Sequence, residues 1–401
     1  GGASAGMLGK SLATLTNASG ATITIKGKAS AGMYAENATP TNAGIINVKG
    51  EKSAGIFAKV SDNKDRSIVN TGSIKLMGTS ETKSAGMYVE IANGATGTTT
   101  LENKNLISVN QKESVGMYIK NKSGNRDLGI ALNSATKGII NLEKESTVGI
   151  YVDNALGENK SIINVKKGNS AGMYGSSDSK ITNALKINIS NEKSAGMYAL
   201  DSEAINTKDG KIKIKGNSGA TGGSAGMYGK LTSNAKKDYT ILNEGKIILN
   251  SELKNVGIYG ETDKNVNHTL TLKNKKLIKI NNGSKQSVGI FAVNDNTNDK
   301  DKLLVVNTED GKIIADSKES IGISAEKSKV ENSGINTMKK GASAGIYGKS
   351  GSEVTNKNKI TIEEKSSAGI YLEDSDALNE TKGKITVKKG ASAGIYGKYS
   401  K

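Results

Sequence analysis

Residues suited to catalysis are few in this 401-residue sequence. It contains no cysteine, which excludes disulfides, thiolate metal sites and cysteine nucleophiles. It contains one histidine, His268, so it can supply at most one histidine base and no multi-histidine metal site. Serine and aspartate are common, and composition alone therefore leaves a Ser/His/Asp triad open.

The letters Gly-x-Ser-x-Gly, typical of the nucleophile elbow of α/β-hydrolases, occur five times. An elbow needs its serine on a turn between a strand and a helix, and no helical pattern follows any of the five. We interpret them as a by-product of a repeat, and we predict that the chain is not an enzyme and has no catalytic residue. They lie at Gly2–Gly6, Gly168–Gly172, Gly222–Gly226, Gly341–Gly345 and Gly390–Gly394.

Two further segments are weak candidates for ligand sites. The loop Asn294–Asp301 is rich in oxygen atoms that suit calcium, but no glycine stands at its sixth position as in an EF-hand loop. The cluster Gly219–Gly223 is not followed by the lysine and helix of a phosphate-binding loop. We predict that the first segment is a solvated polar loop, and that the chain binds no metal and no cofactor.

Aromatic residues are the strongest candidates for binding. Thirteen of the 15 aromatic residues occupy one repeated position. Such a row can stack on itself as part of the scaffold, which we favour. It can also form a strip that binds sugar or peptide. The row comprises Tyr34, Phe57, Tyr88, Tyr118, Tyr151, Tyr174, Tyr198, Tyr228, Tyr259, Phe291, Tyr347, Tyr371 and Tyr396.

These aromatic residues end a motif, Ser-Ala/Val-Gly-Met/Ile-Tyr, that recurs fifteen times with small changes. Successive central glycines lie 23 to 33 residues apart, a period that indicates a repeat architecture. The glycines are Gly6, Gly32, Gly55, Gly86, Gly116, Gly149, Gly172, Gly196, Gly226, Gly257, Gly289, Gly322, Gly345, Gly369 and Gly394.

A second motif, an asparagine followed by a short turn and an alternating apolar strand, lies between successive glycines. Asn70–Leu76 and Asn243–Leu249 are examples. Each repeat thus carries three short strands, with no helical period. We predict an all-β fold, a parallel β-helix of about 14–15 rungs that continues without a break over residues 1–401.

Period-two alternation predicts which side chains face the core. It places the residues on both sides of the glycine inward, among them Ala31 and Val115, and it places serine, glycine and the aromatic residue outward or in a corner. It also stacks the asparagines into a ladder. That ladder would comprise Asn17, Asn42, Asn70, Asn103, Asn133, Asn159, Asn183, Asn206, Asn243, Asn274, Asn307, Asn332, Asn356 and Asn379. Ser324 and Asn336 break the pattern, and we expect a local irregularity there.

The connection from the aromatic position to the asparagine is long in six repeats, which form two blocks at residues 57–133 and 228–307. Insertions at one corner of a repeat protein often mark its binding side. They can equally shield the flank of the helix, and both interpretations stay open. The long connections are Phe57–Asn70, Tyr88–Asn103, Tyr118–Asn133, Tyr228–Asn243, Tyr259–Asn274 and Phe291–Asn307.

The net charge of +17 comes almost entirely from lysine, since Arg66 and Arg126 are the only arginines. Base readout depends on arginine, and single-strand binding needs aromatic residues beside the charge, so we predict no nucleic-acid partner. No run of eighteen apolar residues occurs, and the chain begins and ends inside repeats. We therefore expect a segment of a longer repeat array.

The motif Ser-Ala/Val-Gly-Met/Ile-Tyr, with Asn-x-Gly-x-Ile-x-Val between its copies, resembles the passenger region of large type V autotransporter adhesins of fusobacteria, the RadD-like outer-membrane adhesins. The resemblance covers essentially the whole chain. It implies a right-handed parallel β-helix on the bacterial cell surface, held at the outer membrane by a C-terminal barrel outside this segment. It also implies coaggregation with other bacteria or attachment to a host-cell receptor or glycan.

Three hypotheses follow for function. The first is a non-catalytic adhesin segment that binds protein or glycan through the two blocks of long connections, and we favour it. The second is a stalk that only holds a distal tip away from the membrane. The third, a β-helix carbohydrate-active enzyme, needs carboxylates lined up in a groove, and aspartate and glutamate do not recur in that way. No binding residue can be assigned from the motifs, so the binding residues stay unknown.

Overall fold

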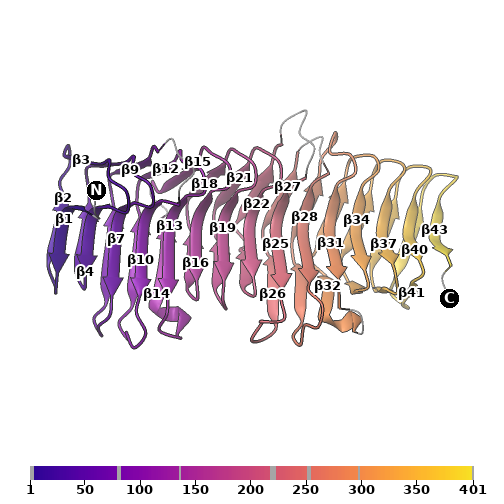
Figure 1. Cartoon of the computed structure of the whole chain (residues 1–401). Coiled ribbons are helices and arrows are strands. Elements are labelled where there is room, and N and C mark those ends of the chain that lie inside the picture. The colour runs from indigo at the N-terminus through magenta and orange to yellow at the C-terminus, as the bar shows by residue number, and fades with distance from the viewer. Residues whose placement is uncertain are drawn as a thin grey trace. The chain divides into compact units, whose positions relative to one another are not determined.

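The computed structural model describes residues 4–78, 83–134, 137–216, 223–250, 254–296 and 299–399. These residues form a nearly all-β structure in which strands stack in parallel from rung to rung (Figure 1). The prediction of a parallel β-helix with three short strands per rung is confirmed. The chain divides into two compact units, Gly1–Ser190 (unit 1) and Asn191–Lys401 (unit 2). Continuity over residues 1–401 stays a prediction.

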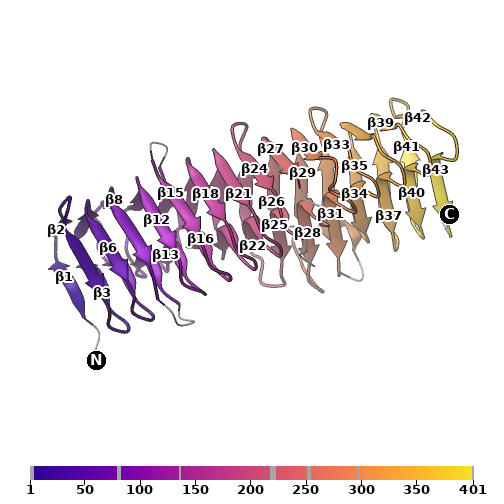
Figure 2. The same ribbon diagram turned by 90° about the horizontal axis from the view of Figure 1, so that it is seen from above.

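Within the described part of unit 1, each of three sheets contains seven strands. Sheet A carries the glycine motifs in β1 (Ala5–Lys10), β4 (Ala31–Glu36), β7 (Ala54–Val60), β10 (Ala85–Ile91), β13 (Val115–Asn121), β16 (Val148–Asp153) and β19 (Ala171–Ser176). Sheet B ends in the asparagines and contains β2 (Thr14–Asn17), β5 (Thr39–Asn42), β8 (Arg66–Asn70), β11 (Thr99–Asn103), β14 (Gly129–Asn133), β17 (Leu156–Asn159) and β20 (Lys180–Asn183). Sheet C contains β3 (Thr22–Ile25), β6 (Ile45–Val48), β9 (Ser73–Leu76), β12 (Leu106–Val109), β15 (Ile139–Leu142), β18 (Ile162–Val165) and β21 (Lys186–Ile189) (Figure 2).

The described part of unit 2 repeats this arrangement, with eight strands in sheet A and seven in each of the others. Its sheet A contains β22 (Ala195–Leu200), β25 (Ala225–Leu231), β28 (Val256–Thr262), β31 (Val288–Asn294), β34 (Ile321–Glu326), β37 (Ala344–Lys349), β40 (Ala368–Glu373) and β43 (Ala393–Lys398). Its sheet B contains β23 (Glu203–Asn206), β26 (Tyr239–Asn243), β29 (Leu270–Asn274), β32 (Leu303–Asn307), β35 (Lys329–Asn332), β38 (Glu353–Asn356) and β41 (Asp376–Asn379). Its sheet C contains β24 (Lys211–Ile214), β27 (Lys246–Leu249), β30 (Leu277–Ile280), β33 (Lys312–Ala315), β36 (Ile335–Met338), β39 (Lys359–Ile362) and β42 (Lys384–Val387).

The helices of the described residues are two short 3-10 turns, η1 (Arg126–Leu128) and η2 (Lys300–Lys302). In the same residues no helix is long and apolar enough to cross a membrane.

The core is built from methionine, isoleucine and valine, one layer per rung. Met33 of sheet A, Ile46 of sheet C and Ile68 of sheet B are all fully buried. Identical positions stack in register, as in the pairs Met33–Ile56 and Ile46–Ile74. Because each rung adds the same small set of buried side chains, a chain with so few aromatic residues still fills its interior.

The prediction for the two residues around the central glycine is confirmed for the residue after it, such as the fully buried Met33, and wrong for the residue before it. A Cβ atom added to Gly32 would point into the core, 3.0 Å from Cγ2 of Ile46 and 2.6 Å from the backbone oxygen of Gly55. The residue before the glycine instead lines the groove beside the aromatic row, where Val115 and Val148 are partly exposed and the smaller Ala31 is only 6% exposed. Both Gly32 and Met33 therefore face inward, and strict alternation fails at this one step of sheet A.

The asparagine ladder is confirmed in both units. In unit 1 the Nδ2 atom of Asn103 donates to Oδ1 of Asn133 at 2.9 Å, and Asn133 donates in turn to Asn159 at 2.8 Å. Asn133 is fully buried, so each amide satisfies the next one away from water. No ladder asparagine of the described residues has a positive φ angle, so these residues are chosen for hydrogen bonding and not for left-handed geometry.

The rung at Gly322 keeps its strand register, with Ile313 paired to Asn336 and Asn336 to Ile360. The expected irregularity is confined to side chains. Asn336 is fully buried in the core, where its Nδ2 atom donates to the backbone oxygen of Gly345 at 2.6 Å. Ser324 interrupts the aromatic row between Phe291 and Tyr347.

The six long connections are only partly loops. In each of these rungs the sheet A strand has seven residues in place of six, and the sheet B strand has five in place of four. Four residues at the added positions have buried side chains: Val60, Ile91, Leu231 and Leu270. Much of each insertion thus widens the core at the corner between sheets A and B, and only the turn between the longer strands is left to project.

Candidate functional site: an aromatic-walled groove

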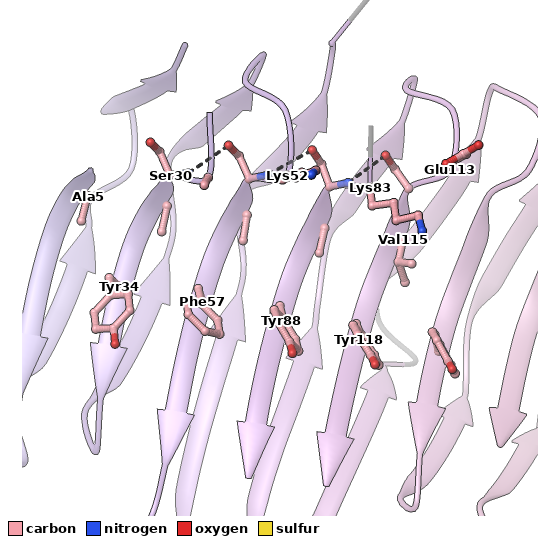
Figure 3. A pocket seen from close by; sticks show the side chains of 18 of the residues that line it. Ala5, Ser30, Tyr34, Lys52, Phe57, Lys83, Tyr88, Glu113, Val115 and Tyr118 are labelled. Carbon is pink, nitrogen blue, oxygen red and sulfur yellow. Dashed lines mark hydrogen bonds between the residues drawn. The ribbon is translucent and has the colours of Figure 1, made fainter. Parts of the chain in front are cut away.

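The aromatic row lies on the outer face of sheet A, one ring per rung. In unit 1, Tyr88 and Tyr118 stack with ring centroids 4.8 Å apart and planes 5° from parallel. The next pair, Tyr118 and Tyr151, has a centroid distance of 4.6 Å and an angle of 6°. Figure 3 shows Tyr34, Phe57, Tyr88 and Tyr118 as one such row. The ring spacing equals the rung spacing of about 4.8 Å between paired strands.

Stacking limits what these rings can bind. In the stacked rungs each ring face is covered by its neighbours, so the edges and hydroxyl groups face solvent. A sugar that binds through its C–H bonds needs an open ring face. Tyr34 departs from this arrangement and meets Phe57 edge to face at 75°. Between Phe57 and Tyr174 the row therefore acts as a wall and not as a sugar-stacking platform.

A groove of about 1040 Å³ runs beside this wall in unit 1. Its floor is the row of small apolar residues before the glycines, including Ala31, Ala54, Ala85 and Val115. Figure 3 shows Ala5 and Val115 of this row. The groove is hollow because these side chains are much smaller than the rings. Methyl groups and ring edges make its surface largely apolar.

The opposite wall is formed by the turns that precede sheet A. Serine hydroxyls in these turns accept hydrogen bonds from the backbone of the preceding rung, as when the backbone nitrogen of Ser53 donates to Oγ of Ser84 at 3.2 Å (Figure 3). The residue before the serine often has a positive φ angle, 50° in both Lys52 and Glu113. Those residues, with Lys83, line the rim of the groove and give it a polar edge.

Burial raises the pKa of three tyrosines in the aromatic row of unit 1, Tyr88, Tyr118 and Tyr151. The pKa of Tyr88 rises to about 12, mainly through loss of hydration and further through the charge of Glu90. Loss of hydration also raises the pKa values of Tyr118 and Tyr151. The phenol groups of these three tyrosines are therefore neutral at physiological pH.

Unit 2 contains a related groove of about 730 Å³ in its last rungs, lined by Ile321, Ala344, Tyr347, Tyr371 and other residues. Two of its tyrosine hydroxyl groups bind one carboxylate. Tyr347 donates to Glu373 at 2.7 Å and Tyr371 donates to the same carboxylate at 3.1 Å. Burial, followed by this hydrogen bond, raises the pKa of Tyr347.

The last long connection of each block contains a 3-10 turn. In η1, Nη1 of Arg126 donates to the backbone oxygen of Asp178 at 3.1 Å, two rungs further on. In η2, Lys300 pairs with Glu353, which also lies two rungs further on. These contacts favour a structural part for the end of each block, and whether the projecting turns bind a ligand stays a prediction.

The other candidates from the sequence are engaged in local contacts. Nδ1 of His268 lies 3.5 Å from the Asp238 carboxylate, between two projecting turns of the second block. The Ser170 hydroxyl donates to the backbone oxygen of Gly168 at 3.0 Å, and the Ser224 hydroxyl donates to that of Asn191 at 2.8 Å. These serines belong to the turns, and their hydroxyl groups are used there.

The oxygen-rich loop is likewise held by its own hydrogen bonds. Nδ2 of Asn294 donates to the backbone oxygen of Asp299 at 2.9 Å, and the Asp299 carboxylate accepts from the backbone of Asp301 at 2.8 Å. Two residues of this loop, 297 and 298, and most of Gly219–Gly223 lie outside the described residues. Within the described part of the chain, no cluster of three or more acidic or histidine side chains could hold a metal ion.

The groove itself was not predicted. The rings were identified from their spacing, but alternation placed the residues of the floor in the core. One signal in the sequence points to it. The residue before the glycine varies from alanine to valine to isoleucine, as Ala85, Val115 and Ile321 show, and such variation in volume is unusual for a closely packed core position.

Comparison with known families gives a partial match. Residues 2–154 match the family model described as the BigA third pectate lyase-like domain. Searches of curated proteins and of solved structures found no match. The match does not show that the chain belongs to the RadD-like adhesins of fusobacteria, and that resemblance stays a prediction. The fold and the match together support, for residues 2–154, a β-helix region of the autotransporter passenger type.

Proposed function

We propose that the chain is a non-catalytic segment of a bacterial surface adhesin, and that the groove of unit 1 binds a protein on a target bacterium or host cell. The observation that carries this proposal is the groove of about 1040 Å³ between the aromatic wall and the serine turns. Apolar hollows with a polar rim are common sites of protein binding.

The ligand is a protein segment with apolar side chains. The floor offers methyl groups, and the wall offers ring edges, which suit aliphatic and aromatic side chains. Charged residues such as Lys52, Lys83 and Glu113 stand only at the rim, where they can orient a partner. The covered ring faces make a glycan the weaker candidate for this groove.

Outer-membrane display and a role in coaggregation or host attachment belong to the same proposal. They are supported by the passenger-type match over residues 2–154 and by the repeat motifs. Absence of catalysis is also part of the proposal. It is supported by the use of the Gly-x-Ser-x-Gly serines in turns, where Ser170 and Ser224 bind backbone oxygens.

A stalk is the second candidate. The regular hydrogen-bonded and stacked rows favour it, because identical rungs such as those of Asn103 and Asn133 build length without building a specific site.

Cell binding separates the two candidates. The fluorescently labelled chain is incubated with a panel of bacterial and epithelial cells, before and after treatment of those cells with protease or with periodate. The proposal expects saturable binding that protease removes and that periodate leaves intact. Binding to no cell type would favour the stalk, and loss after periodate alone would indicate a glycan ligand.

A further inference from the structure

We propose a second binding surface, on sheet C of unit 2, for a linear anionic polysaccharide. Five of the seven strands in this sheet begin with an exposed lysine. We call them the lysine row: Lys211, Lys246, Lys312, Lys359 and Lys384.

The lysine row is in register. Lys211 pairs with Lys246, and Lys359 pairs with Lys384, as direct neighbours on adjacent strands. Leu277 and Ile335 occupy the same position on the two strands between. Adjacent strands lie about 4.8 Å apart, so the ammonium groups form one line across the strands, with intervals of one or two rungs.

The row is not neutralised by its surroundings. Among the described residues, no carboxylate lies within ion-pair distance of any of its five lysines. Lys215, Lys279 and Lys339 add positive charge on the same face. Acidic groups near the row lie in the turns before the strands, at Asp209, Glu244, Glu309, Asp310 and Glu380, and directly after two strands, at Asp316 and Glu363. Glu244 is paired with Lys275 and Glu363 with Lys388, and none of these carboxylates pairs with the row.

The fold does not require lysine at this position. Sheet C of unit 1 has the same geometry, and its strands begin with Thr22, Ile45, Ser73, Leu106, Ile139, Ile162 and Lys186. Polar and apolar residues both serve there, with one lysine among seven. The concentration of unpaired lysine in unit 2 is therefore a property of this surface and not of the β-helix.

The chemistry favours an anionic polysaccharide over nucleic acid. The strands of this sheet carry neither arginine nor an aromatic residue, so they lack both the fork that reads bases and the platform on which bases stack. Lysine binds sulfate and carboxylate groups as a point charge. A line of such charges suits a chain that carries an acidic group at regular intervals, and it raises the local concentration of that chain.

Binding of heparin fragments, measured by calorimetry over a range of salt concentrations, tests this surface. The row variant changes all five lysines to threonine (K211T/K246T/K312T/K359T/K384T), the residue found at position 22 in unit 1. We expect the wild-type chain to bind, and the row variant to lose about tenfold or more in affinity, with a weaker dependence on salt. The control removes five exposed lysines elsewhere (K26T/K49T/K144T/K236T/K264T) and should change affinity by less than about twofold.

Each outcome decides the matter. Equal losses in the row and control variants would show that net charge alone attracts heparin, which would overturn the surface. Tighter binding of single-stranded DNA than of heparin would overturn the polysaccharide. A triple variant (K246T/K312T/K359T) with an intermediate loss of heparin affinity supports the proposed surface even if the row variant folds poorly. This result is independent of the unit 1 groove, because the groove contains none of these lysines.

Discussion

The central glycine of each repeat is required by the approach of neighbouring rungs. At Gly86, a Cβ atom would lie 2.5 Å from the backbone oxygen of Gly116 and 3.1 Å from Cγ2 of Ile107. Neither contact can relax by rotating a flexible side chain tip. Glycine is therefore required here because no larger residue fits between the neighbouring rungs, and not because the backbone has a positive φ angle.

Gly86→Ala should destabilise the protein by about 1–3 kcal/mol, the usual effect of overpacking a core. Gly390→Ala is the matched control, because nothing lies within 4 Å of the Cβ position there. Urea unfolding of both variants measures the difference. Similar stability of the two would show that the rungs can separate to admit a methyl group.

The buried asparagines have a comparable requirement for hydrogen bonding. Asn133→Ala removes the acceptor of Asn103 and the donor to Asn159, both in the closed interior. Each unsatisfied buried group costs about 1–3 kcal/mol. Asn164→Ala removes a similar donor to Asn141 and acceptor from Asn188 on the outer face of sheet C, where water replaces the lost bonds, and should cost far less. Equal losses in thermal unfolding would contradict this account.

The aromatic wall makes the stability of the protein depend on pH in the alkaline range. Burial holds the pKa values of Tyr88, Tyr118 and Tyr151 above the ordinary value of 10.0, with Tyr88 at about 12. A raised pKa in the folded state stabilises the protein fully below the ordinary value, and this stability is lost as pH rises through the folded value. Thermal unfolding should therefore shift to lower temperature between about pH 10 and pH 12.

Tyr118→Phe keeps the stacked ring but removes one ionising group. The variant should lose less stability than the wild-type chain over this alkaline range, and ultraviolet titration should show one fewer late-titrating phenol. An unchanged alkaline profile would indicate that the rings titrate freely and that the wall is open to water.

The start of the first block depends on a buried arginine. Arg66 has a side chain only 2% exposed, and its Nη2 atom donates to Oδ2 of Asp62 at 2.5 Å and to the backbone oxygen of Asn37 at 3.1 Å. This hydrogen bond is the main cause that lowers the pKa of Asp62. A lowered pKa contributes stability above the ordinary value of 3.8, and that stability disappears as pH falls through the folded value.

Breaking a fully buried ion pair by removing one partner costs about 3–5 kcal/mol. Arg66→Met should destabilise the chain by less than this, because Asp62 keeps some contact with water. The difference in melting temperature from wild type should shrink below about pH 4, where Asp62 is protonated in the unfolded chain. Arg126→Met is the control, since Arg126 is more exposed and lies 3.3 Å from the Asp178 carboxylate. A difference that persists in acid would assign the effect of Arg66 to packing alone.

At the scale of the whole molecule, the sequence predicts the fold because equivalent positions of every repeat have the same structural surroundings. Asparagine at one position and methionine or isoleucine at another recur in rung after rung, so chance matches are averaged out. Single rungs were predicted less well. The register through Asn336 is regular although its side chain suggested a break, since hydrogen bonding of the strands on both sides fixes the backbone.

The groove could not be predicted in the same way. The groove exists because alternation fails at one position, the central glycine, whose Cβ position points into the core. The residue before it therefore lines the floor of the groove and does not enter the core. A period-two pattern contains no sign of such a step. The widened core of the long connections was missed for a related reason, because added strand residues such as Val60 and Ile91 look like loop residues when only the length of the connection is counted.

The central claim is that the unit 1 groove is the binding site, and filling it is the most direct test. The variant A31I/A54I/A85I places on the floor the residue that unit 2 carries at the same position, Ile321, so the fold should persist. The control T22I/S73I adds isoleucine to sheet C of unit 1, where Ile45 and Ile139 already occur.

The measurement is the affinity of each variant for the cells that bind the wild-type chain. Loss of the apolar contact area should weaken binding of the groove-filled variant by about tenfold or more, a cost of about 1.4 kcal/mol. The control should bind as the wild-type chain does, and both variants should keep its melting temperature. Unchanged affinity in a folded, groove-filled variant would contradict the claim.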